Sequence, residues 1–96
     1  MKVIIIGGGI AGLSAGIYAQ RCGFESEIHE KHIIPGGLCS YWSRQGYFID
    51  NCVHWLTGTN PAREMHRVWE ELDVLPKGLK VFQHQSFMQV ELDGQS

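Results

Sequence analysis

The sequence lacks the features that mark several common classes of protein. Its 96 residues carry eight Lys plus Arg against ten Asp plus Glu, so it has neither the basic face that binds nucleic acid nor an acidic tail. Three widely spaced cysteines do not fit the disulfide framework of a small secreted domain and predict a reduced, cytoplasmic protein. The sequence contains no Cys-x-x-Cys or His-x-x-x-His pair, so we expect no metal site.

A long apolar segment is missing as well. Residues 3–19 carry no charge, but this run holds five glycines and is shorter than the roughly 20 apolar residues that span a bilayer. Its strongly apolar part stops at Ile6, and no small-residue cleavage site follows at a suitable position, which disfavours a signal peptide. We therefore expect no transmembrane segment, and peripheral contact of the full protein with a membrane stays open.

Glycine, by contrast, is abundant and unevenly placed, because seven of the twelve lie at or before Gly36. The β-branched run Val3–Ile6 is typical of a strand that is buried on both faces of a parallel sheet. From Ile10 to Cys22 the apolar residues recur at spacings of three and four, which predicts a widely buried helix. Gly23 suits the C-terminal cap of this helix, and a second strand is expected over Glu25–Glu30.

Between the first strand and the helix lies a Gly-x-Gly-x-x-Gly motif, the pattern of a dinucleotide-binding loop. Gly7 makes the tight turn, Gly9 lets a pyrophosphate approach the backbone, and Gly12 allows close packing of helix and strand. Glu30 follows about 20 residues later, where a carboxylate accepts hydrogen bonds from the adenosine ribose. Gly16, one helical turn further on, indicates close packing against the sheet. Strand, loop, helix and acid thus agree in order and spacing.

The rest of the chain is predicted to contain a further helix and three short strands. We expect a loop over residues 31–46, a strand at Tyr47–Ile49, a helix that begins at Asn60 and Pro61 with Met65, Val68, Trp69 and Leu72 on one face, and strands at Leu79–Phe82 and Phe87–Leu92. Asp93-Gly94 is a strong hairpin signal, but no second strand follows before Ser96. We therefore interpret the chain as the truncated N-terminal part of a longer protein.

The segment after Glu30 distinguishes a flavin from a nicotinamide dinucleotide. There the run Pro35-Gly36-Gly37-Leu38-Cys39 resembles the two-dinucleotide-binding-domain flavoproteins. The stretch GYFIDNCVHWLTG and the later Trp-Glu-Glu-Leu of residues 69–72 are similar to the phytoene desaturase and retinol saturase group of that family. The resemblance covers residues 2 to about 75 and implies an α/β fold, a Rossmann-like FAD/NAD(P)-binding domain, with FAD as the cofactor.

The resemblance also implies which residues contact FAD. The set comprises Gly7, Gly9, Ile10, Ala11, Gly12, Glu30, Lys31, Gly36, Gly37 and Leu38. Lys31 is explained equally well as a solvated lysine. Leu38 stands where the amine oxidases of the family have an arginine, and Asn51 or Cys52 stands where many relatives have glycine.

These observations divide the chain into residues 1–75, the N-terminal β-α-β part of an FAD-binding domain, and residues 76–96, the start of a β-rich segment. The full protein is then an FAD-dependent oxidoreductase that transfers hydride between flavin and a small-molecule substrate. The resemblance implies an apolar, isoprenoid-like substrate, and we expect the 96-residue chain alone to be inactive. Two alternatives stay open, an NAD-binding dehydrogenase or small nucleotide-binding module, and a non-catalytic piece that binds a partner without any cofactor.

Two other groups of residues are weaker candidates for a site. A nucleophilic pair of Cys39 and His54 is compatible with the spacing, but nothing in the sequence marks either residue as activated. Aromatic side chains are numerous enough to line a pocket, although packing explains each of them more simply; they are Tyr41, Trp42, Tyr47, Trp55 and Trp69.

Overall fold

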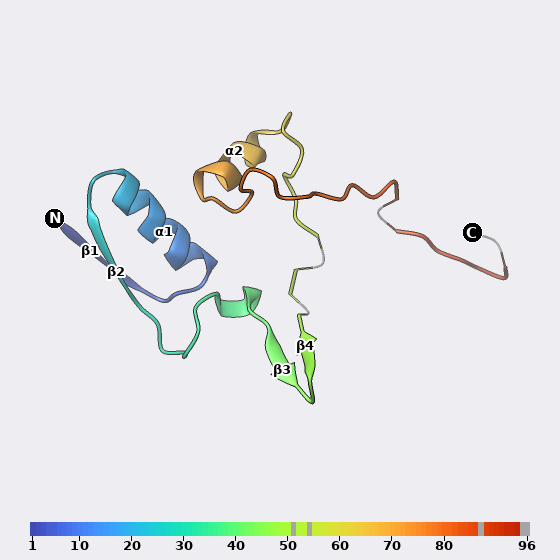
Figure 1. Cartoon of the computed structure of the whole chain (residues 1–96), viewed down its shortest axis with the longest axis horizontal. Coiled ribbons are helices and arrows are strands. Elements are labelled where there is room, and N and C mark those ends of the chain that lie inside the picture. The colour runs from blue at the N-terminus through green and yellow to red at the C-terminus, as the bar shows by residue number, and fades with distance from the viewer. Residues whose placement is uncertain (51, 54, 87, 95–96) are drawn as a thin grey trace.

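The computed structural model describes residues 1–50, 52–53, 55–86 and 88–94 (Figure 1). The elements, in chain order, are β1 (Lys2–Ile6), α1 (Ile10–Arg21), β2 (Glu25–His29), the short 3-10 helix η1 (Gly37–Cys39), β3 (Trp42–Arg44), β4 (Tyr47–Ile49) and α2 (Glu64–Glu71). Figure 1 shows β1, α1 and β2 side by side at one end, with the β3–β4 hairpin and the segment after α2 extending away from them.

The N-terminal unit is a parallel β-α-β arrangement, as the sequence predicts. β1 pairs with β2 from Lys2 opposite Glu25 to Ile6 opposite His29, and α1 packs on this pair. After α1 the chain turns at Gly23, whose φ of +86° is the left-handed conformation expected of a helix cap. The α/β Rossmann-like fold class predicted from the sequence is therefore confirmed.

Close packing holds α1 on the sheet. A β-carbon at Gly16 would lie 3.1 Å from Cδ1 of Ile28, so the helix approaches β2 at the distance that only glycine allows without adjustment. Among the twelve residues of α1, all of which the structure describes, Gly16 alone is buried. The prediction of a widely buried helix is wrong, because the described residues supply two strands to the sheet that α1 covers.

The sheet is covered on one face. Val3 and Ile5 are half-buried, whereas Ile4 and Ile6 on the opposite face are 61% and 83% exposed. The expectation that β1 is buried on both faces is therefore wrong, since side chains alternate across a strand and α1 packs on one side.

A hairpin occupies part of the region predicted as loop. β3 and β4 are antiparallel, with Trp42 opposite Ile49, and the turn residues Gln45 and Gly46 both have positive φ, as a type I′ turn requires. The predicted strand Tyr47–Ile49 is confirmed as β4. β3 was missed because its three residues show no apolar alternation, and it owes its structure to the partner strand.

Helix α2 begins later than predicted, at Glu64. Asn60 does not cap it: its Oδ1 accepts the N–H of Ala62 at 3.0 Å and its carbonyl accepts the N–H of Arg63 at 3.0 Å, which closes a separate turn before the helix. The Tyr18 hydroxyl of α1 donates to Oε2 of Glu71 at 2.5 Å, and this hydrogen bond links the two helices.

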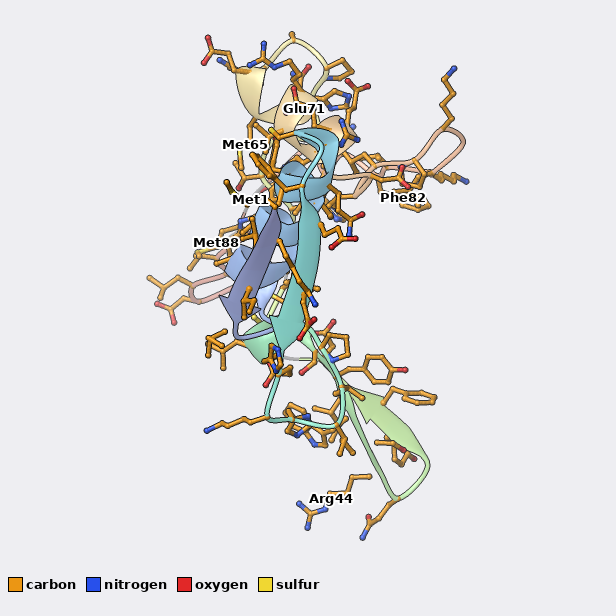
Figure 2. The ribbon with its side chains drawn as sticks, turned by 90° about the vertical axis from the view of Figure 1, so that its left-hand side faces the viewer. Met1, Arg44, Met65, Glu71, Phe82 and Met88 are labelled. Atoms are coloured by element: carbon orange, nitrogen blue, oxygen red, sulfur yellow. The ribbon has the colours of Figure 1, made fainter. Side chains whose placement is uncertain are left out.

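The described residues between Leu79 and Leu92 form no strand, so the predicted strands at Leu79–Phe82 and Phe87–Leu92 are wrong for residues 79–86 and 88–92. The labelled Phe82 lies away from the β-α-β unit in Figure 2. Asp93 and Gly94 have φ of +49° and +76°, the left-handed values that their hairpin signal predicts. In the part of the chain that the structure describes, no helix has the length and hydropathy to cross a membrane.

Candidate dinucleotide-binding site

The candidate site lies at the carboxyl ends of β1 and β2, where the glycine motif joins strand to helix. The N–H of Gly7 donates to the carbonyl of His29 at 2.7 Å, which extends the β1–β2 ladder by one bond. Gly7 then turns the chain with a φ of +105°, a conformation that side-chain-bearing residues rarely adopt. The chain therefore leaves the sheet immediately, and the next residues reach the start of α1.

Gly12 fixes how closely α1 approaches this turn. A β-carbon at Gly12 would lie 1.9 Å from the carbonyl oxygen of Gly7, a distance that no real atom pair of this kind tolerates. It would also lie 3.4 Å from Cγ2 of Ile5. The packing role that the sequence predicts for Gly12 is thus present in the structure, and its strongest constraint is the loop backbone.

The N-terminus of α1 carries free backbone amides. Gly9 is the N-cap, its carbonyl accepts the N–H of Leu13 at 2.9 Å, and it has no side chain to cap the first turn. The first turn of α1, described in full, contains no acidic residue. Ile10 and Ala11 are exposed there. Uncapped amides and the positive end of the helix dipole together favour an anion such as a phosphate.

Glu30 lies directly beside the glycine loop. Its Oε2 accepts the N–H of Gly8 at 2.6 Å, and its Oε1 accepts the N–H of His32 at 3.0 Å. Hydrogen bonds from the backbone N–H groups of His32 and Gly8 lower the pKa of the Glu30 carboxyl, so it is ionised at neutral pH. Each carboxylate oxygen has more than one acceptor position, so further donors can bind.

The second glycine pair packs against the first. The N–H of Gly36 donates to the carbonyl of Gly8 at 2.8 Å, and Gly36 forms an isolated parallel bridge with Gly9. A β-carbon at Gly37 would lie 3.1 Å from Cα of Gly9, so the two backbones nearly touch. Three segments that are distant in the sequence therefore meet: the glycine loop between β1 and α1, Glu30 and the Gly36–Gly37 pair.

Two residues of this arrangement were not predicted. Gly8 was not assigned a role, yet it donates to Glu30, and a β-carbon at Gly8 would lie 3.1 Å from Cβ of Glu30. His32 supplies the second backbone donor to the same carboxylate. The run of three glycines was a usable signal for Gly8, whereas the backbone contact of His32 does not depend on residue type and leaves no mark in the sequence.

An open hollow of about 620 Å³ lies next to Glu30. It is lined by Ile6, Gly7, Ile28, His29, Glu30 and Lys31. Lys31 thus lies at the site, while Leu38 in η1 is 90% exposed. The hollow lies at the carboxyl ends of the parallel strands, which is where α/β sheets bind their ligands.

The other candidate groups have different positions. His54 lies outside the described residues, and the sulfur of Cys39 instead lies 3.7 Å from that of Cys52. Tyr41 packs edge-on against Phe48, and Trp69 donates to the carbonyl of Thr57. Trp55 belongs to the lining of a second hollow of about 750 Å³. Within the described ranges, no three His, Cys, Asp or Glu side chains form a group able to hold a metal ion.

The matching family model is the NAD(P)-binding Rossmann-like domain, over residues 5–72. This match covers more than half of the chain, and it contains the glycine motif, Glu30 and the second glycine pair. The chain therefore belongs to the family of NAD(P)-binding Rossmann-like domains.

Curated relatives support the more specific resemblance to the carotenoid desaturase group. The chain is 40% identical over 50 residues to 4,4'-diapolycopen-4-al dehydrogenase of Metabacillus indicus, a match of 52% of this chain and 10% of that protein. It is 30% identical over 73 residues to 1-hydroxycarotenoid 3,4-desaturase of Flavobacterium sp. (strain P99-3), which covers 76% of this chain and 15% of that protein. The first of these relatives is named as a dehydrogenase and the second as a hydroxycarotenoid desaturase.

A third relative is an uncharacterized protein in the nifH2 3' region of Methanothermococcus thermolithotrophicus, 35% identical over 60 residues, which are 62% of this chain and 58% of that protein. The chain thus spans between 10% and 58% of the length of these three relatives. No solved structure matches the chain.

Proposed function

We propose that this chain binds FAD and forms the cofactor-binding part of an oxidoreductase. The observation that carries the proposal is the 2.6 Å hydrogen bond from Gly8 to Glu30, because it holds an ionised carboxylate beside the uncapped N-terminus of α1. An anion-binding group and a ribose-binding group are then next to each other, which is the arrangement that an adenosine diphosphate moiety requires.

Each part of the site has a distinct role in this proposal. The amides of Ile10, Ala11 and Gly12 would receive the pyrophosphate, and Glu30 would accept the ribose hydroxyls, with Lys31 at the edge of the adjoining hollow. The packed backbones of Gly9 and Gly37 leave no side chain between the loops, which suits a dinucleotide that passes from one loop to the other. When bound, FAD supplies the hydride-transfer chemistry, while the protein positions it.

We further propose that the full protein acts on an apolar, isoprenoid-like substrate. Support comes from the names of two relatives, which refer to a diapolycopenal and to a hydroxycarotenoid. Molecules of this apolar class partition into membranes. We therefore also propose that the full protein contacts a membrane peripherally, from the cytoplasmic side.

Substitution of Gly9 tests the site directly. Gly9 has ordinary extended backbone angles, φ −77° and ψ −173°, and a β-carbon there would meet Cα of Gly37 at 3.8 Å, an ordinary contact. Gly9→Val should therefore fold but lose FAD, because the side chain would occupy the approach of the pyrophosphate. FAD binding is measured by flavin fluorescence and calorimetry, and folding by far-ultraviolet circular dichroism. A folded Gly9→Val chain that binds FAD as tightly as the parent contradicts the assignment.

A matched pair of acids tests the ribose contact. Glu30→Ala should weaken FAD binding roughly ten- to hundredfold, the effect of losing hydrogen bonds to a charged group. Glu27→Ala, three positions earlier and inside β2, where the carboxylate is paired with Lys2 and His29, should leave FAD affinity unchanged. Equal affinities for the two variants would remove Glu30 from the site.

A second candidate function, a small nucleotide-binding module that uses NAD, is favoured by one observation. The Methanothermococcus relative is matched over 58% of its length, so a related protein is not much longer than the matched region. Calorimetry with FAD and with NAD on the same preparation separates the two candidates, since the proposal requires the tighter binding to be that of FAD.

A further inference from the structure

The β3–β4 hairpin brings two cysteines together at its open end. Cys39 is the last residue of η1, and Cys52 follows β4. Trp42 pairs with Ile49 at this end, so the segments that enter and leave the hairpin run side by side. The sulfur atoms of Cys39 and Cys52 are 3.7 Å apart, and both side chains are exposed. The sulfurs are therefore in non-bonded contact, and they must approach further to reach the S–S length of about 2.05 Å in a disulfide.

The third cysteine provides an internal comparison. Cys22 is also exposed, but it follows α1, where its N–H donates to the carbonyl of Tyr18. In the described part of the chain, it has no cysteine beside it. Differences between Cys22 and the pair therefore report on proximity and not on exposure.

We propose that Cys39 and Cys52 form a reversible dithiol–disulfide pair that cross-links the Gly36–Gly37 segment to the end of the hairpin. The oxidant is a small-molecule disulfide of the glutathione class. Formation of the bond does not depend on FAD, whereas its effect on the cofactor rests on the proposed function.

The exchange conserves electrons and protons. The Cys39 thiol loses its proton, and the thiolate attacks one sulfur of the oxidant, whose S–S bond breaks and releases one thiolate that takes up a proton. The Cys52 thiol then loses its proton, attacks the Cys39 sulfur of the mixed disulfide and expels the second thiolate, which is protonated in turn. The two cysteine thiols together lose two electrons and two protons. The small disulfide gains them and becomes two thiols.

The electrostatics of the pair agree with this order. The hydrogen bond with Cys39 raises the pKa of the Cys52 thiol, and partial desolvation and the nearby charges of Cys39 and Asp50 raise it further, so Cys52 retains its proton when the other sulfur is ionised.

The cross-link would act close to the candidate site. The N–H of Cys39 donates to the carbonyl of Gly36 at 3.0 Å, and Gly36 itself donates to Gly8. Ser40 Oγ also donates to the carbonyl of Gly37 at 2.8 Å, so the cysteine belongs to a hydrogen-bonded turn that carries both glycines. Restricting this turn should slow the release of FAD, because a pre-ordered loop loses less entropy on binding.

The test equilibrates the 96-residue chain with oxidised and reduced glutathione at increasing ratios and then alkylates the remaining thiols. Peptide mass spectrometry should find Cys39 and Cys52 joined and protected, with the loss of two hydrogens, while Cys22 stays alkylated or carries glutathione. Dithiothreitol should restore both thiols. Cys39→Ser and Cys52→Ser should each abolish the intramolecular bond, and Cys22→Ser should leave it intact.

Two results would overturn the proposal: glutathione adducts on all three cysteines without a Cys39–Cys52 peptide, or a Cys22-containing disulfide formed as readily. The release rate of FAD is then compared between the oxidised and reduced chains. A disulfide that forms without any change in FAD release overturns the effect on the cofactor but keeps the pair. A disulfide that forms in a chain with no FAD affinity contradicts the proposed function and leaves the redox pair established.

Discussion

The β-α-β unit of residues 2–29 and the described residues of the segment 79–94 contain similar strand-forming residues but have different structures. In the first, β1 hydrogen-bonds to β2 along its full length, and α1 packs on the pair. In the second, Leu79, Val81 and Phe82 are exposed, and the described residues form no strand. The contrast shows that β-branched and aromatic composition produces a strand only where a partner strand and a packed face are available.

The largest expected effect comes from Gly12, the glycine that allows the β-α-β unit to pack closely. Gly12→Ala should lower the free energy of unfolding by about 3 kcal/mol, because its β-carbon would collide with the backbone oxygen of Gly7, which cannot move without opening the turn. Gly16→Ala is the matched control, since its new contact is the flexible end of Ile28. Urea unfolding followed by circular dichroism measures both, and equal losses for the two variants would refute the role of the Gly7–Gly12 contact.

A smaller effect is expected when Glu30 is replaced, and it concerns how the folding stability depends on pH. Its pKa is lower in the folded chain than its ordinary value of 4.5, so the carboxylate contributes stability that is fully present above that value. This contribution is lost as the pH falls through the folded pKa. Glu30→Gln should therefore reduce stability at neutral pH and make the acid limb less steep. Urea midpoints measured from neutral pH down to about pH 3, a range that spans the ordinary carboxyl pKa, test this, and an unchanged slope would argue against the Gly8 and His32 hydrogen bonds.

The smallest effect should come from the link between the two helices. Tyr18→Phe removes the hydrogen bond to Glu71, which also raises the pKa of the Tyr18 hydroxyl in the parent chain. We expect faster hydrogen exchange at the amides of α2, with little change in β1, α1 and β2, because those elements are held by their own ladder and packing. Faster exchange throughout β1 and β2 would mean that the β-α-β unit is not independent and that α2 stabilises it.

Much of the candidate site was predictable because its signals are local. The strand Val3–Ile6, the glycine motif and the helix after it follow one another directly, and each glycine has a steric reason visible in its spacing. The pairing of Gly36 with Gly8 and the approach of Gly37 to Gly9 were not predicted, since 28 positions separate the partners. The FAD contacts of all ten predicted residues stay predictions.

The failures have equally physical causes. The helix expected at Asn60 begins at Glu64, because the Asn60 side chain satisfies the N–H of Ala62 in a turn and not a helical amide. β3 was missed because its residues Trp-Ser-Arg show no apolar alternation, whereas the equally short β4 is a continuous apolar run. The proximity of Cys39 and Cys52 was not anticipated either, for it depends on the register of the hairpin between them.

The order of residues alone was enough for the β-α-β unit, the turn at Gly7 and the close packing at Gly12, because backbone conformation, helical spacing and strand composition act over a few neighbouring positions. Three features depended on the folded chain: the Gly8–Glu30 hydrogen bond, the contact of the two glycine pairs and the meeting of two cysteines. Each of them joins segments that are far apart in the sequence. Such contacts are set by the register of the parallel strands and of the hairpin, which local preferences do not determine.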